Sequence, residues 1–133
     1  MLPPETGADV VAQFVEDAAH YPGGHAAGVV RPGSLAELSA CLRDARRVLP
    51  VGAQSSLTGG ATPMGDLVLS TNRLIGLEVT GGVVRAGAGV TLQTLQDVLA
   101  KEGRWFPPVP TYLGATVGGA VAKIGRASCR ERV

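Results

Sequence analysis

Apolar and polar positions along the chain alternate with two different periods. Apolar residues spaced three or four apart predict helices at residues 9–19, 34–47 and 91–101. Short apolar runs bounded by glycine, proline, asparagine or serine predict strands at residues 27–31, 48–51, 67–70, 74–80 and 83–86. This order predicts a β-α-β unit, then a short strand, a hairpin and a further helix.

Local signals set the expected ends of these elements. Ser34 and Glu37 form a capping box, and the helix that follows is expected to place four apolar residues on one face: Leu35, Leu38, Leu42 and Ala45. Gly81-Gly82 predicts a two-residue hairpin turn, because both positions tolerate φ > 0. Thr91 is expected to cap the last helix, which ends near Gly103 and turns three leucines inward: Leu92, Leu95 and Leu99.

The stretch V-G-A-Q-S-S-L-T-G-G at 51–60 follows the second predicted strand and combines glycines with hydroxyl side chains. Glycines let a ligand approach the main chain, and the Ser and Thr hydroxyls add donors. No Lys or Arg lies between Arg47 and Arg73, so an anion here would be bound by dipoles. A phosphate-transferring P-loop needs a Gly-Lys pair that is absent, which favours a bound diphosphate cofactor. An ordinary surface turn is the alternative interpretation.

A second glycine-containing stretch, P-P-V-P-T-Y-L-G-A-T-V-G-G, occupies 107–119. V-V-R-P at 29–32 and V-R-A-G-A-G-V at 84–90 precede it in order. With these motifs, the chain from about residue 21 to 122 resembles the N-terminal part of the FAD-binding domain of the vanillyl-alcohol oxidase and p-cresol methylhydroxylase (PCMH) superfamily. Within it, the chain is most similar to FAD-linked oxidases of the D-lactate dehydrogenase and glycolate oxidase subunit type.

The resemblance implies an α+β, PCMH-type FAD-binding domain. Such a domain has an N-terminal β-α-β subdomain and a second, mixed or antiparallel β subdomain with flanking helices, of which only the start is expected here. It implies that the first loop wraps the FAD diphosphate through Gly52, Ala53, Gln54, Ser55, Ser56, Leu57, Thr58 and Gly60. It implies that the second segment lies along the flavin and the diphosphate through Pro110, Thr111, Gly114, Ala115, Thr116, Gly118 and Gly119.

Two departures from the family pattern concern these contacts. Many relatives carry Gly-x-Gly-Thr where Gly52-Ala53-Gln54-Ser55 stands, and an acidic residue where Val109 stands. Some members attach the flavin covalently through a histidine in or near the first loop. Because no histidine lies there, non-covalent FAD is expected.

The implied function is that of a flavin-dependent oxidoreductase, which oxidises a 2-hydroxy acid or another alcohol by hydride transfer to FAD. No catalytic residue is assigned in this chain, and the substrate, the electron acceptor and the oligomeric state stay open. Two alternatives stand beside this hypothesis. In the first, the chain is a non-catalytic nucleotide-binding module. In the second, it is an inactive fragment that does not fold alone.

The last eleven residues, K-I-G-R-A-S-C-R-E-R-V at 123–133, depart from the family's small-residue continuation. From Ile124 onward they match one reading frame of a widely used sequencing adapter, and such segments are excluded from fold reasoning. We therefore expect a partial FAD-binding domain at 1–122 and a non-native tail at 123–133.

Composition and local motifs also bear on the expected partners and location of the protein. The net charge of +1 gives no signature of a polyanion-binding protein, and nucleic acid is not expected as a partner. The N-terminus lacks the pattern of a signal peptide and no run is long enough to span a bilayer, so a cytoplasmic protein is expected. His20 and His25 lack a third ligand at metal spacing, so no metal site is expected. Cys41 is expected to be a small buried side chain rather than half of a disulfide.

Three further features have competing interpretations. Gly87-Ala88-Gly89 before a helix suggests a dinucleotide fold, but Leu92 stands where the third glycine is needed. Trp105-Phe106 is expected to close the core as a buried pair, with stacking on the flavin as the alternative. Arg31 either reaches the cofactor or caps a strand edge.

Overall fold

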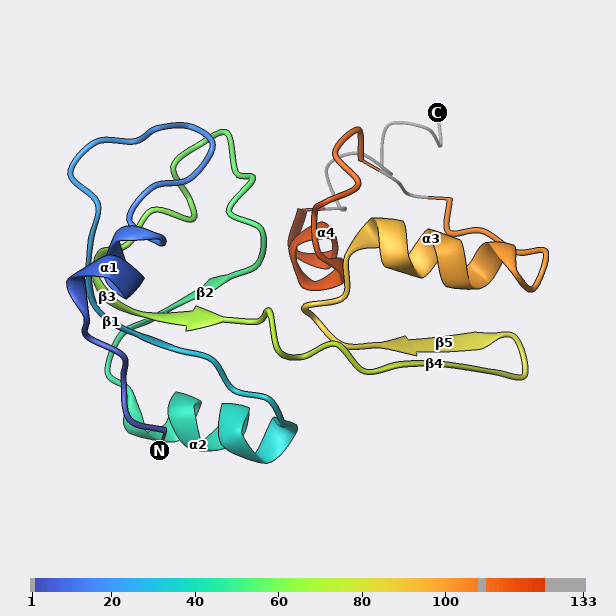
Figure 1. The fold of residues 1–133 in the computed structure, drawn as a ribbon, viewed down its shortest axis with the longest axis horizontal. Helices are drawn as coiled ribbons and strands as arrows, with labels where there is room; N and C mark the ends of the chain where they lie inside the picture. The colour runs from blue at the N-terminus through green and yellow to red at the C-terminus, as the bar shows by residue number, and fades with distance from the viewer. Residues whose placement is uncertain (1, 108–109, 124–133) are drawn as a thin grey trace. The chain divides into compact units, whose positions relative to one another are not determined.

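The computed structural model describes residues 2–107 and 110–123 (Figure 1). The chain divides into two compact units, residues 1–73 and residues 74–133, which are described separately as unit 1 and unit 2. Pro108 and Val109, together with the suspected tail from Ile124 onward, lie outside the described residues.

Unit 1 is built on a three-stranded parallel sheet of β1 (His25–Val30), β2 (Val48–Val51) and β3 (Met64–Ser70). The spatial order is β1-β3-β2, so the β-α-β crossover leaves room for β3 between its two strands. The expected bounds of β2 are confirmed, whereas β1 and β3 begin earlier than predicted. The carboxyl ends of all three strands lie at the same end of the sheet, where open α/β sheets bind ligands.

A helix lies on each face of this sheet: α1 (Ala8–Ala12) and α2 (Leu35–Asp44) (Figure 1). Neighbouring strand residues point to opposite faces, which gives unit 1 two apolar layers. The α1 side contains Val29, Val51 and Val68, packed against Val10, Val11 and Phe14. The α2 side contains Val30, Cys41 and Leu69, packed against Leu38 and Val48. The expected burial of Cys41 is confirmed.

Helix α2 begins with the predicted cap in a modified form. Ser34 Oγ accepts from the Glu37 N–H at 3.2 Å, while Glu37 Oε2 accepts from the Gly33 N–H at 2.7 Å, one residue before the position of a standard capping box. The helix ends at Asp44 rather than Arg47, because Ala45 is extended. The expected apolar face is wrong in part. Leu35 and Leu42 are exposed, and the contact with the sheet is made by Leu38 and Cys41.

The predicted helix at 9–19 is also wrong beyond its first turns, since α1 ends at Ala12. The carbonyl of Phe14 accepts from the Gln54 side chain at 2.9 Å, which competes with a helical bond. The Asp17 carboxylate accepts from the Ala19 and Ala61 N–H groups, at 3.0 and 3.2 Å. Hydrogen bonds to a distant loop have therefore replaced the local helical ones.

Unit 2 consists of a β-hairpin and two helices. Strands β4 (Leu77–Thr80) and β5 (Val83–Ala86) are antiparallel, and Gly81 and Gly82 have φ of 57° and 86°, which confirms the predicted Gly-Gly turn. Helix α3 (Leu92–Ala100) packs its buried leucines on the hairpin, and α4 (Val117–Lys123) adds Val117 and Ala120 to the same cluster. Thr91 caps α3 as predicted, accepting from the Thr94 N–H at 3.1 Å.

The leucine cluster of unit 2 gives a first prediction. Leu92 is 1% exposed, and its replacement by alanine leaves a cavity beneath α3. The Leu92→Ala variant is expected to lose about 2–5 kcal/mol of unfolding free energy, measured by urea unfolding followed by circular dichroism. The matched Leu35→Ala variant removes the same atoms from a side chain that is 78% exposed, and is expected to lose less than about 1 kcal/mol. Equal losses would contradict the assigned core.

Asp66 joins the start of β3 to the segment before β2. The Met64 N–H, which donates to Asp66 Oδ2 at 2.9 Å, lowers the pKa of this carboxyl below its ordinary value. Partial burial opposes the shift, and the Arg47 guanidinium, 3.1 Å from Asp66 Oδ1, adds to it. A lowered folded-state pKa stabilises the fold above the unfolded-state pKa, and this contribution is lost as pH falls through the folded value.

We therefore expect Asp66→Asn to destabilise unit 1 modestly at neutral pH, because an amide lacks the charge that attracts Arg47. The difference in unfolding free energy from the unsubstituted chain should vanish in acid, once the Asp66 carboxyl is protonated. Urea unfolding at a series of pH values measures this difference. A difference that is constant across the series would contradict the assigned role of the charge.

Candidate functional site

The loop after β2 leaves the sheet at its carboxyl edge and turns on two residues with positive φ. Gln54 has φ of 49°, which is uncommon for a residue with a side chain, and Gly59 has φ of 76°. A Cβ at Gly59 would lie 3.0 Å from the Tyr21 ring, so the loop packs closely on the chain that precedes β1. Left-handed positions of this kind let successive main-chain N–H groups converge on an anion.

The main-chain donors of this loop are largely unused. Thr58 N–H donates to Ser56 Oγ at 3.3 Å. Within the part of the chain that the structure describes, no acceptor is found for the N–H groups of Gly52, Ala53, Gln54, Ser55, Leu57, Gly59 and Gly60. Beside the loop, Thr62 Oγ1 is buried and has no hydrogen-bond partner among the described residues. This surplus of donors without any cationic side chain fits a diphosphate bound by dipoles.

The predicted site residues of the first loop differ in their accessibility. Ser56 is buried, Gly52 and Gln54 are half-buried, and the remainder are exposed: Ala53, Ser55, Leu57, Thr58 and Gly60. The hydroxyls of Ser56 and Thr58 lie 3.2 Å apart. The Gln54 side chain is committed within the protein, because its Nε2 donates to the carbonyls of Phe14 and Ala61, both at 2.9 Å. Gln54 Nε2 is therefore not available to donate to a ligand.

The second predicted segment belongs to unit 2 and ends in α4. Its N–H groups are mostly used at the helix start: Val117 donates to Val90 O, Gly118 to Ala88 O, and Gly119 to Thr116 Oγ1, at 2.8, 3.0 and 3.2 Å. A Cβ at Gly118 would lie 2.9 Å from the Ala88 Cβ. Gly118 is thus needed for packing, a role that the motif alone did not reveal.

Other parts of the second segment keep their main-chain donors available. The N–H groups of Thr111, Gly114 and Thr116 have no acceptor among residues 2–107 and 110–123. Pro110, Thr111 and Gly119 are exposed, whereas Gly114, Ala115 and Gly118 are half-buried and Thr116 is buried. Any main-chain contact to a ligand is therefore expected before α4 rather than at its Gly-Gly pair.

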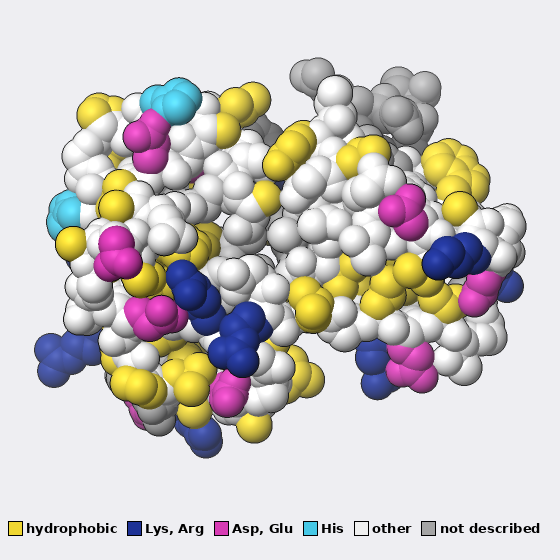
Figure 2. Space-filling model, viewed as in Figure 1, with side chains coloured by type: hydrophobic (Ala, Val, Ile, Leu, Met, Phe, Trp, Pro, Cys, Tyr) yellow, Lys and Arg dark blue, Asp and Glu magenta, His cyan; other side chains and the backbone are white. Residues whose placement is uncertain are grey.

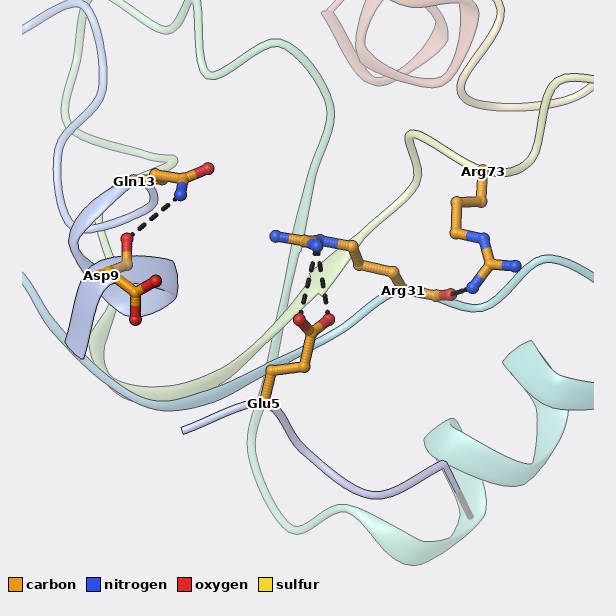
Figure 3. Close-up of polar contacts among 5 residues, drawn as sticks. All are labelled: Glu5, Asp9, Gln13, Arg31 and Arg73. Atoms are coloured by element: carbon orange, nitrogen blue, oxygen red, sulfur yellow. Dashed lines mark hydrogen bonds and ion pairs between the residues drawn. The ribbon is translucent and has the colours of Figure 1, made fainter. Parts of the chain in front are cut away.

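Arg31, at the carboxyl end of β1, is held by its neighbours (Figure 3). Its Nη1 lies 3.4 Å from Glu5 Oε1, its guanidinium lies over the Phe14 ring at 5.5 Å, and its carbonyl accepts from Arg73 Nη1 at 3.5 Å. These contacts pair the Arg31 charge with Glu5, while Arg31 Nε is buried and has no hydrogen-bond partner among the described residues, so both interpretations of Arg31 stay open.

Of the remaining candidates, Phe106 and Gly87 have structural roles, whereas Trp105 is exposed. Trp105 is 69% exposed, so the predicted buried pair is wrong for it, while Phe106 does pack on the core. The Gln96 side chain bonds both the N–H and the carbonyl of Phe106 and thereby orients that residue inward. A Cβ at Gly87 would lie 2.1 Å from Leu74 O, which explains this glycine without a nucleotide.

The described part of the chain has no candidate metal centre and carries charged side chains of both signs. No group of three potential metal ligands occurs there, and His20 and His25 are exposed. On the face shown in Figure 2, Lys and Arg side chains are interspersed with Asp and Glu. None of the described helices combines the length and apolar character that a membrane crossing requires.

Comparison with a family model decides the relationship. Residues 26–133 match the model of the FAD binding domain. The chain belongs to this family. The predicted resemblance to PCMH-type FAD-binding oxidases and the predicted fold are thereby confirmed.

The chain is also similar to two curated D-lactate dehydrogenases. The protein of Archaeoglobus fulgidus is 43% identical over 101 residues, which cover 71% of this chain and 23% of the relative. The quinone-dependent D-lactate dehydrogenase of Escherichia coli K12 is 35% identical over 123 residues, which cover 82% of this chain and 22% of the relative. The chain spans less than a quarter of the length of either relative.

The fold also matches a solved structure. Cholesterol oxidase from B. sterolicum superposes with a TM-score of 0.67 at 20% identity, and the match covers 92% of this chain and 26% of that protein. At this level of identity the likeness concerns the fold alone.

Proposed function

We propose that this chain is the FAD-binding portion of a flavin-dependent oxidoreductase that oxidises a 2-hydroxy acid or another alcohol. The observation that carries the proposal is the loop after β2, most of whose N–H groups lack acceptors among the described residues and which follows the carboxyl end of a parallel strand, where open α/β sheets bind ligands. Membership of the FAD-binding domain family and the similarity to two D-lactate dehydrogenases support it.

The residues proposed to hold FAD lie in the two predicted segments. The first loop binds the diphosphate through the main chain of 52–60 and the hydroxyls of Ser55 and Thr58. The second segment is proposed to contribute the main chain of Thr111, Gly114 and Thr116, and the other predicted positions in it are Pro110, Ala115, Gly118 and Gly119. Because the first loop contains no histidine, attachment is proposed to be non-covalent.

When bound, FAD supplies a hydride acceptor for the oxidation of an alcohol carbon. This chain's own residues orient the cofactor and balance its diphosphate charge with dipoles. The catalytic residues and the substrate contacts are proposed to lie outside residues 1–122. We also propose that 1–122 is a partial domain and that 123–133 is a non-native tail, which sequencing of the source gene tests.

The proposed function is tested on the complete product of the gene that contains this sequence. We expect the purified protein to show a flavin spectrum, either as isolated or after addition of FAD, and anaerobic D-lactate or another 2-hydroxy acid to bleach it. Binding of ADP without any flavin binding would favour a nucleotide-binding module. Failure to bind flavin at all would refute the proposal.

A further inference from the structure

A short segment before β1 is hydrogen-bonded to the loop after β2. We call residues 14–19 the brace. The Phe14 carbonyl accepts from Gln54 Nε2 at 2.9 Å, and the Ala18 N–H donates to Gln54 O at 3.0 Å. The Asp17 carboxylate accepts from the Ala61 N–H at 3.2 Å. The brace is thus hydrogen-bonded to the loop at Gln54 and to Ala61, the residue that follows the loop.

Asp17 is the charged member of the brace and is only 3% exposed. Its Oδ1 accepts from Ala19 N–H and its Oδ2 from Ala61 N–H, so each oxygen bonds one main-chain donor. A buried carboxylate is costly unless its oxygens are hydrogen-bonded. Here one of those bonds crosses 44 residues of sequence to the loop, which makes the loop conformation depend on this side chain.

The loop needs external support because of its own backbone. Gln54 has a left-handed conformation, which is unfavourable for a residue with a Cβ and persists only when the surroundings impose it. The brace supplies two of the bonds that hold Gln54. Asp17 also occupies the Ala61 N–H, so that donor is directed away from any ligand of the loop.

We propose that Asp17 is a positioning residue. Its carboxylate fixes Ala61 and thereby holds the N–H groups of 52–60 in the arrangement that receives the diphosphate. The part of this inference that concerns FAD rests on the proposed function, whereas the dependence of the loop on Asp17 does not.

The first measurement is hydrogen exchange in the full chain without FAD. Asp17→Ala removes both acceptors, and exchange of the hydrogen-bonded amides of Thr58, Ala61 and Thr62 is expected to quicken about tenfold or more, because bonds to charged groups are stronger than neutral ones. Asp17→Asn keeps one acceptor oxygen and is expected to give an intermediate rate. The matched control Asp97→Asn changes an exposed carboxylate on α3, and exchange in 52–62 should stay unchanged.

Exchange in β3 separates positioning from general folding. If Asp17 positions the loop, amides of residues 64–70 keep their exchange rates in both variants. If β3 exchanges faster in both variants, Asp17 supports the whole fold and the proposal is overturned. If the alanine variant does not fold, the asparagine variant decides between these outcomes.

The second measurement is FAD affinity, obtained by flavin fluorescence titration of the complete gene product. Asp17→Ala is expected to raise the dissociation constant about tenfold, with a similar effect for ADP, which shares the diphosphate. Unchanged affinity together with unchanged loop exchange would overturn the proposal. If the unsubstituted protein binds no FAD, the proposed function fails, and the exchange measurement alone decides the role of Asp17 in the loop.

Discussion

Replacing Gly24 by alanine is expected to weaken FAD binding about a hundredfold and to destabilise unit 1. A Cβ at this position would lie 1.7 Å from the Val15 carbonyl oxygen and 2.9 Å from Thr62 Cγ2, so the brace must move away. Its hydrogen bonds to Gln54 and Ala61 would then be lost, and each contributes about 1 kcal/mol. Fluorescence titration with FAD measures the loss in the complete protein.

Gly33→Ala is the matched control for this change. Its Cβ would make ordinary contacts, with the nearest atoms, on Arg73 and Glu37, at 3.6 Å. We expect the FAD affinity and the unfolding free energy of this variant to stay within about 0.5 kcal/mol of the unsubstituted protein. A Gly24→Ala variant that binds FAD as tightly as the control would show that the brace does not shape the loop.

Gly87→Ala is expected to destabilise unit 2 by about 3 kcal/mol or more. The new Cβ would lie 2.1 Å from Leu74 O, where the chain entering β4 passes the end of β5. Two bonds close this crossing: Gly87 N–H donates to Gly76 O at 2.7 Å, and Gly89 N–H donates to Leu74 O at 2.9 Å. Alanine would force the two segments apart and lengthen both bonds. Urea unfolding and hydrogen exchange of the hairpin measure the effect.

Gly76→Ala tests whether the loss at Gly87 comes from the close contact. Gly76 lies in the same crossing, but nothing lies within 4 Å of a Cβ built on it. Its alanine variant is therefore expected to unfold within about 1 kcal/mol of the unsubstituted chain. Similar losses in the two variants would indicate general intolerance of side chains there, and would contradict the packing explanation for the Gly87-Ala88-Gly89 motif.

Sequence patterns located the elements whose signals are local. The run at 48–51 lies between a charged helix end and a glycine, and β2 has these bounds. The Gly-Gly turn and the Thr91 cap were predictable for the same reason, because each needs only a few adjacent residues. The position of the candidate loop follows directly from the end of β2.

Elements that depend on distant contacts were not predictable. The helix at 9–19 has a favourable pattern, yet bonds from Gln54 and Ala61 end it early, and nothing near Asp17 in the sequence points to those partners. Leu42 fits the apolar period of α2, but the short helix contacts the sheet through Leu38 and Cys41. The motif likewise could not show that the Gly118 and Gly119 N–H groups donate within the chain.

The most direct test of the account compares amide hydrogen exchange of the complete protein with and without FAD. The account predicts that FAD slows exchange at residues 52–60, whose N–H groups are largely without acceptors in the described part of the chain, and changes Gly118 and Gly119 little. Protection by FAD that leaves residues 52–60 unaffected would contradict it.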